Sequence, residues 1–313
     1  MQGRLNHVPL SLPTVREQDC PDHEPLVHDS VRDSLPALRA VETWLQTLHV
    51  YGAAGIAAFG WAMCRMMGAD ARPWLPMWFC AALLLYNTDR LRHDPSDGIN
   101  TPKREESARK LRPWGWALIA ASAVALLVLP IQHGDWLTLV LTVGGSVVCL
   151  NYSVPVRGFR LKDIPLLKTF FAPSLVVAAV FGLPLLHAQA HLGVRCVLLI
   201  LWASTILFSN MVLCDLRDVP GDVKCGVVSV PSRLGPGRTR RLLWILAAAT
   251  ASIGVLLAVF QPAPGFPWLR LTLAASAYLA SLIVAVDRAR SERFYEWCVE
   301  GILFVPALAL LPG

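Results

Sequence analysis

Residues 194–222 read VRCVLLILWASTILFSNMVLCDLRDVPGD, an apolar run that ends in a cluster of acids. An α-helix rises about 1.5 Å per residue, so roughly twenty residues cross the ~30 Å hydrocarbon core of a bilayer. The run therefore predicts a membrane-spanning helix whose acidic end reaches the membrane surface.

The same pattern recurs along the chain, which has 313 residues, of which 55% are hydrophobic and only 16% are charged. Soluble chains carry roughly 25% charged residues, so the composition excludes a soluble globular protein. Long apolar runs separated by charged loops are typical of a multi-span membrane protein. We expect nine spans, at residues 45–66, 74–92, 113–131, 135–154, 164–186, 194–215, 241–260, 267–286 and 294–311.

Lysine and arginine gather in alternate loops, those that follow the second, fourth, sixth and eighth expected spans. Positive loops lie in the cytoplasm, so we expect an integral multi-pass protein of a bacterial inner (cell) membrane. Its N-terminus is expected inside and its C-terminus outside. The net charge of +6 lies in these loops rather than in one patch, so the lipid bilayer is an expected partner and nucleic acid is not.

The segment before the first span, residues 1–43, is rich in Pro, Asp, Glu and His without periodicity. It predicts a flexible cytoplasmic tail, and residues 44–313 predict one transmembrane domain. Two long charged loops follow spans two and six, four helices apart, and each begins at an Asp-bearing helix end. This spacing predicts an all-α membrane protein with two similar four-helix halves and a ninth span.

Three acids at the end of the quoted run, Asp215, Asp218 and Asp222, stand at i, i+3 and i+7. Helical geometry places all three carboxylates on one stripe, unless Pro220-Gly221 breaks the helix and turns Asp222 inward from a loop. Clustered carboxylates repel one another and need a cation. Mg²⁺ is the natural candidate because it binds carboxylate oxygens and recruits phosphate oxygens of a substrate; a solvated acidic loop paired with its own arginines is the alternative.

The longer pattern around these acids, D-x-x-D-x-x-x-D-x-K-x-G-V-x-S-V-P-x-R-L-G over residues 215–235, resembles the second aspartate-rich motif of UbiA-type intramembrane prenyltransferases. A second element, residues 151–168, is similar to the Tyr-Ser-x-Pro and Arg-Leu-Lys segment of that family. The resemblance implies an enzyme that binds an isoprenyl diphosphate through Mg²⁺ between two aspartate motifs. It also implies transfer of the isoprenyl group to an aromatic or other lipophilic acceptor, in a bundle open to the lipid.

The first motif departs from the family pattern. The resemblance implies the pattern Asn-Asp-x-x-Asp-x-x-x-Asp with an Asn-x-Pro-x-Arg tail. The tail is present, because Asp97 is followed by Gly-Ile-Asn100-Thr-Pro-Lys-Arg104, but the first Asn and the next two Asp positions hold Asp89, Arg90 and His93. Asp94 stands one residue late, before a proline that disfavours helix at that position. We expect Asp89, Asp94 and Asp97 to converge through a loop and to share the metal with the second motif.

A cationic and polar set is expected around the diphosphate: Lys162, Lys168, Lys224, Arg104, Arg90, Asn87, Asn210 and Tyr152. Several members have alternatives. Arg90 either contacts the diphosphate or neutralises Asp94 at i+4. Asn87 and Asn210 either ligate metal or satisfy a neighbouring helix, and Tyr152 either steadies an allylic cation with its ring or is structural.

Two other functional classes are compatible with the same sequence. A membrane terpene cyclase would use the same diphosphate site without an acceptor, and a transporter or non-catalytic protein would keep only the scaffold. Transport pathways place ionisable residues at mid-membrane, whereas the acids here lie at helix ends. Glu296 and Glu300 start the ninth expected span, where the helix dipole favours carboxylates; a role at the acceptor site is the alternative.

Overall fold

The computed structural model describes residues 36–92, 95–154, 160–187, 189–260, 267–286 and 291–311. The chain divides into two units, Met1–Val41 and Glu42–Gly313. Of the expected tail, residues 1–35 lie outside the described residues, and Pro36 begins a helix.

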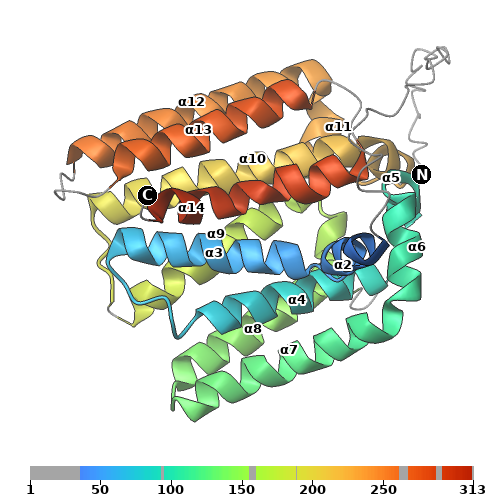
Figure 1. Ribbon diagram of the computed structural model, residues 1–313, viewed down its shortest axis with the longest axis horizontal. Helices are drawn as coiled ribbons and strands as arrows, with labels where there is room; N and C mark the ends of the chain where they lie inside the picture. The colour runs from blue at the N-terminus through green and yellow to red at the C-terminus, as the bar shows by residue number, and fades with distance from the viewer. Residues whose placement is uncertain are drawn as a thin grey trace, which may run out of the picture. The chain divides into compact units, whose positions relative to one another are not determined.

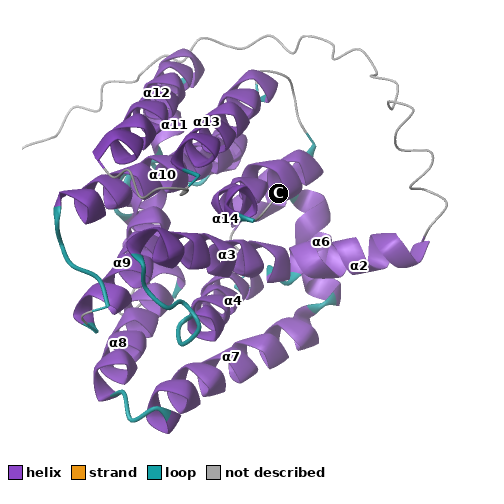
Figure 2. Cartoon of the chain, turned by 60° about the vertical axis from the view of Figure 1, so that its left-hand side comes forward, coloured by secondary structure: helices purple, strands orange, loops and turns teal. Residues whose placement is uncertain are grey.

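The described residues form helices and loops and contain no strand, which confirms the all-helical class expected from the sequence (Figures 1 and 2). In chain order the elements are α2 (Pro36–Thr47), α3 (Val50–Met67), α4 (Leu75–Leu91), α5 (Pro95–Asn100), α6 (Pro102–Lys110), α7 (Arg112–Gln132), α8 (Trp136–Ser153), η1 (Leu161–Asp163), α9 (Leu167–Leu186), α10 (Val194–Lys224), α11 (Val230–Leu234), α12 (Pro236–Phe260), α13 (Trp268–Ala285), η2 (Phe294–Val299), η3 (Ile302–Phe304) and α14 (Val305–Leu310).

Five of these helices are long and apolar enough to cross a membrane, counted over the described ranges: α7, α9, α10, α12 and α13. Each of the other expected spans also contains helix, but α4 is 17 residues long and the last segment is divided among a π-helical turn, a 3₁₀ turn and α14. The helical segments were therefore predictable, while the number of crossings remains a prediction.

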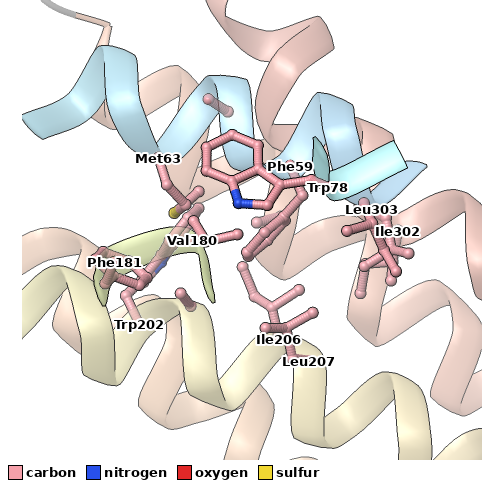
Figure 3. Packing of buried hydrophobic residues seen from close by; sticks show 14 of the residues in the cluster. Phe59, Met63, Trp78, Val180, Phe181, Trp202, Ile206, Leu207, Ile302 and Leu303 are labelled. Atoms are coloured by element: carbon pink, nitrogen blue, oxygen red, sulfur yellow. The ribbon is translucent and has the colours of Figure 1, made fainter. Parts of the chain in front are cut away.

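The core lies where α3, α4, α9 and α10 meet. Figure 3 shows Phe59, Trp78 and Ile206 pointing into a common interior, and Phe59 and Ile206 have no exposed surface. Around this core α10 packs against α5, α9 and α12, α12 packs against α13, and α7 packs against α4 and α8. Figure 2 shows the α12–α13 and α7–α8 pairs on opposite sides of α10 and α3. The polar end of α10 is thereby brought beside α5, which follows α4 in the chain.

Candidate functional site

The second acidic cluster lies on one continuous helix. α10 runs through Pro220 and Gly221 to Lys224, so Asp215, Asp218 and Asp222 share a helical face. Lys168, from the first turn of α9, points into this cluster: its Nζ lies 2.7 Å from Asp222 Oδ1, 3.4 Å from Asp218 Oδ2 and 3.6 Å from Asp215 Oδ1. The cation that these acids require is therefore supplied, in part, by the chain itself.

The segment after α10 positions Lys168. The N–H of Leu166 donates to the Val228 carbonyl at 2.8 Å, and the N–H of Val230 donates to Thr169 Oγ1 at 3.1 Å. The Thr169 hydroxyl in turn donates to Asp215 Oδ2. Because residues on both sides of Lys168 are bound to this segment, the start of α9 is held against the acidic face of α10.

A second cation, Arg217, balances the middle acid. Its Nε donates to Asp218 Oδ1 at 2.8 Å, and both side chains are largely buried. The three carboxylates, Lys168 and Arg217 together leave one net negative charge. One carboxylate atom of the set, Asp215 Oδ1, is buried and has no hydrogen-bond partner.

The first acidic cluster is carried by α4 and α5. Asp89 lies in the last turn of α4, with Lys162 Nζ 3.9 Å from its Oδ1, and Asp97 lies in α5. Burial raises the pKa of Asp97, and the positive charges of Arg104 and Lys162 oppose that rise. Asp94 and His93 lie outside the described residues.

Asn100 joins the two clusters, and the sequence analysis assigned it no role. Its Oδ1 accepts a 2.8 Å hydrogen bond from the N–H of Gly221, between Asp218 and Asp222. The sequence contains an indication of a role for Asn100, because this residue belongs to the tail of the first motif. Figure 1 shows α5 beside the C-terminal part of α10, which is the packing that this bond fixes.

We expect Gly221→Ala to separate α5 from α10. A Cβ at Gly221 would lie 2.5–2.7 Å from the Asn100 amide, closer than real Cβ contacts, so one helix must move. Loss of the bond and the overpacking together should lower the free energy of unfolding by about 1–3 kcal/mol. Thermal unfolding in detergent measures this, with Gly237→Ala as control because nothing lies within 4 Å of that Cβ. Equal melting temperatures for the two variants would contradict the assigned contact.

One cavity, with a volume of about 160 Å³, receives side chains from both clusters. Four aspartates line it, Asp89 and Asp97 from the first cluster and Asp215 and Asp218 from the second, and Glu300 is a fifth acid in its wall. The cationic side chains that line it are Arg90, Arg104, Lys162, Lys168 and Arg217. A polyanion that carries hard cations matches this lining. Its anionic groups would lie against the arginines and lysines, and its cations would lie against the carboxylates.

A second cavity, of about 380 Å³, lies among α4, α7, α8 and α9 and is lined mainly by apolar side chains such as Met77, Leu126 and Leu183. Leu85 lines both cavities, so the charged one and the apolar one share a wall. A ligand with a charged head and a hydrocarbon tail is the class of molecule that fits such a pair.

Four further predicted residues have defined contacts. Arg90 lines the charged cavity, yet its guanidinium also donates to the backbone carbonyls of Gln46 and Thr47, each at 2.8 Å. The buried Asn87 amide donates to the Leu48 and Leu83 carbonyls.

On the facing helices, the Asn210 amide donates to the Val299 carbonyl at 2.8 Å while lining the charged cavity. Tyr152 also lines it and stacks on Phe171 with ring centroids 4.4 Å apart.

Three predicted residues that the structure describes do not line the charged cavity: Asn87, Asp222 and Lys224. Lys224 is exposed at the end of α10. Asp222 is fully buried and binds Lys168 at 2.7 and 2.8 Å. The helix continues through Pro220-Gly221, so Lys224 points to solvent rather than folding back over the acids.

The donor set suits a hard divalent cation that arrives with a ligand. Within the described part of the chain, no three His, Cys, Asp or Glu side chains are grouped so as to hold a metal by themselves. Carboxylate oxygens face the cavity from both sides, however, and Asp215 Oδ1 is buried there without a hydrogen-bond partner. A cation that keeps waters and takes phosphate oxygens needs only a few protein ligands, so the residues fit it.

Residues 94–304 match the family described as UbiA prenyltransferase family, so the chain belongs to that family. The family and the enzyme class expected from the sequence are thereby confirmed. The apo structure of a UbiA homolog from Aeropyrum pernix K1 shares the fold: the TM-score is 0.56 at 14% identity, over 83% of this chain and 97% of that one.

Two curated relatives show the range of the family. The digeranylgeranylglyceryl phosphate synthase of Methanopyrus kandleri is 28% identical over 198 residues, which cover 61% of this chain and 67% of that protein. The bacteriochlorophyll synthase 33 kDa chain of Rhodobacter capsulatus is 28% identical over 176 residues, which cover 53% of this chain and 55% of that protein. The second match thus spans about half the length of the relative.

Proposed function

We propose that this protein is a Mg²⁺-dependent intramembrane prenyltransferase that moves an isoprenyl group from an allylic diphosphate to a lipophilic acceptor. The observation that carries the proposal is the charged cavity between the two acidic clusters, which shares Leu85 with an apolar cavity. The diphosphate would occupy the charged cavity and the isoprenyl chain the apolar one.

The roles of the side chains follow from where they lie. Lys168, Lys162 and Arg104 line the cavity and would bind and orient the diphosphate oxygens. Asp218 and Asp215 on one wall, and Asp97 and Asp89 on the other, would hold Mg²⁺. Bound with the diphosphate, Mg²⁺ supplies charge stabilisation for the departing pyrophosphate, which is the main barrier-lowering effect for such a leaving group.

The proposal includes the membrane topology expected from the sequence. Each of the nine apolar segments contains helix, and five of the described helices are long enough to cross a bilayer. We propose that the other four also cross, as two four-helix halves and a ninth span. The N-terminus and the acidic clusters would then face the cytoplasm of a bacterial cell and the C-terminus would lie outside.

Mass spectrometry of products tests the proposal. Membranes that contain the protein should convert an isoprenyl diphosphate into pyrophosphate and a prenylated lipophilic product, and excess EDTA should abolish both because the leaving group loses its metal. Release of a hydrocarbon or terpenol without any acceptor would instead identify a terpene cyclase. No consumption of any isoprenyl diphosphate would contradict enzymatic function on this substrate class.

A further inference from the structure

The charged cavity is also lined by polar residues that have no role in binding the diphosphate. His49, just before α3, Gly52, in the first turn of α3, and Glu300, which follows η2, line the same cavity as Asp215 and Asp218. Segments from the beginning and the end of the domain therefore meet there.

Two atoms at this end lack hydrogen-bond partners. His49 Nδ1 and Glu300 Oε2 are both buried and unpaired. Such atoms cost about 1–3 kcal/mol each when nothing binds them, so they mark places that a ligand or water satisfies. A Cβ built on Gly52 would lie 3.0 Å from Glu300 Oε2 and 3.1 Å from His49 Nδ1. Both atoms therefore lie close to the bare backbone of Gly52, at the part of the charged cavity that His49, Gly52 and Glu300 line together.

The proton on His49 follows from its other contact. The Arg90 guanidinium has only donors, so the His49 Nε2 atom that it touches must accept, and the ring hydrogen lies on Nδ1. The ring is held in place by stacking on Tyr86, with centroids 4.4 Å apart. The backbone of His49 is left-handed, with a φ of 55°, a conformation that costs energy in a non-glycine residue and that clusters at functional sites.

The space beside Gly52 therefore presents one donor, His49 Nδ1–H, and one acceptor, the Glu300 carboxylate. A hydroxyl group is the common functional group that both accepts and donates one hydrogen bond. We propose that this space is the acceptor subsite, that it binds the nucleophilic hydroxyl of an alcohol or phenol, and that Glu300 is the general base of an O-prenylation. The inference rests on the proposed function and specifies its acceptor.

The step balances without a further reactant. The bond between the allylic carbon and the diphosphate oxygen breaks, and its electron pair leaves with the diphosphate. A lone pair of the acceptor hydroxyl oxygen forms the new carbon–oxygen bond, and the hydroxyl proton passes to a Glu300 carboxylate oxygen. His49 Nδ1–H holds the acceptor oxygen during this exchange, and Arg90 acts as a positioning residue through His49.

Glu300→Gln is the most selective change, because the amide keeps the shape of the side chain but cannot take the proton. We expect prenyl transfer to fall by roughly 100-fold or more, the usual contribution of a general base. Binding of geranylgeranyl diphosphate in the presence of Mg²⁺ should stay within about two-fold, since the diphosphate end is unchanged. Glu296→Gln is the matched control, since Glu296 borders a different cavity and lies one helical turn away.

Gly52→Ala is an independent variant. Its methyl group would fill the space between His49 Nδ1 and Glu300 Oε2, so transfer should fall while the affinity for geranylgeranyl diphosphate is kept. A retained affinity also shows that the variant is folded. It therefore distinguishes loss of the acceptor subsite from misfolding of the protein.

The assay uses full-length protein in membranes, with geranylgeranyl diphosphate as donor, the native membrane lipids as acceptor pool and tandem mass spectrometry of the products. An oxygen-linked prenyl product that Glu300→Gln and Gly52→Ala lose, and Glu296→Gln keeps, supports the inference. A carbon-linked product, full transfer by Glu300→Gln, or equal loss of diphosphate binding in both test variants overturns it and leaves the prenyltransferase function standing. No product from the wild-type protein overturns both.

Discussion

Lys168→Met is expected to lower the free energy of unfolding by about 3–5 kcal/mol, since removal of one partner from a buried ion cluster leaves uncompensated charge. The lysine lies within 3.6 Å of all three carboxylates of α10, and its side chain is only 11% exposed. Methionine has a similar length and no charge, so the loss isolates the electrostatic contribution. Prenyl transfer should also be lost, because Lys168 lines the charged cavity.

Thermal unfolding and pyrophosphate release measure these two effects. Lys110→Met is the control, because that lysine is 72% exposed in an i,i+4 pair with Glu106 and should contribute no more than about 0.5 kcal/mol. Asp222→Asn in the Lys168→Met background should restore part of the stability, since it removes one of the repelling charges. A Lys168→Met variant as stable as wild type would refute the assigned role of the cluster.

Asp218→Asn is the second change with a large expected effect. Asp218 lines the cavity, and its carboxylate forms ion pairs with both Arg217 and Lys168. It therefore lies where a metal-bound diphosphate would contact the second motif. Neutralising it should reduce Mg²⁺-dependent pyrophosphate release by about 1000-fold, comparable with the loss of one main charge-stabilising group at a reaction centre.

A pyrophosphate-release assay across Mg²⁺ concentrations checks this expectation. Asp163→Asn, in η1, is the control because it makes the same chemical change outside the cavity. Asp163 pairs with Arg160, so the activity of this variant should stay near that of the wild type. If Asp218→Asn retained full turnover at ordinary Mg²⁺ concentrations, the metal assignment for α10 would be wrong.

Much of the fold was predictable because its signals are local. Apolar run length placed the helices, and the spacing of Asp215, Asp218 and Asp222 placed them on one face of α10. The same spacing rules do not predict the residue at which a helix ends. Pro220 and Gly221 carry strong helix-breaking propensities, yet α10 continues to Lys224, where packing against α5 and the bond that the Gly221 N–H donates to Asn100 outweigh local preference.

The aspartates that line the charged cavity were predictable from the sequence, and the cations that line it less so. Positive residues near a membrane surface all look alike in sequence, because topology alone accounts for them. Only tertiary structure separates Lys168, buried among carboxylates, from Lys224, exposed at the end of α10. The partners of Arg90, two backbone carbonyls and His49, lie more than forty residues away in sequence, so no local pattern indicates them.

The central claim is that acids from α5 and from α10 hold one ligand, and a double-mutant cycle on Asp97→Asn and Asp218→Asn tests it. The measured quantity is the Mg²⁺-dependent affinity for a non-hydrolysable isoprenyl diphosphate analogue, with the protein in nanodiscs. Two carboxylates that hold the same metal-bound diphosphate should be coupled by about 1 kcal/mol or more, so the double variant loses much less than the sum of the single losses. Losses that add in full would mean that the two clusters act on separate ligands.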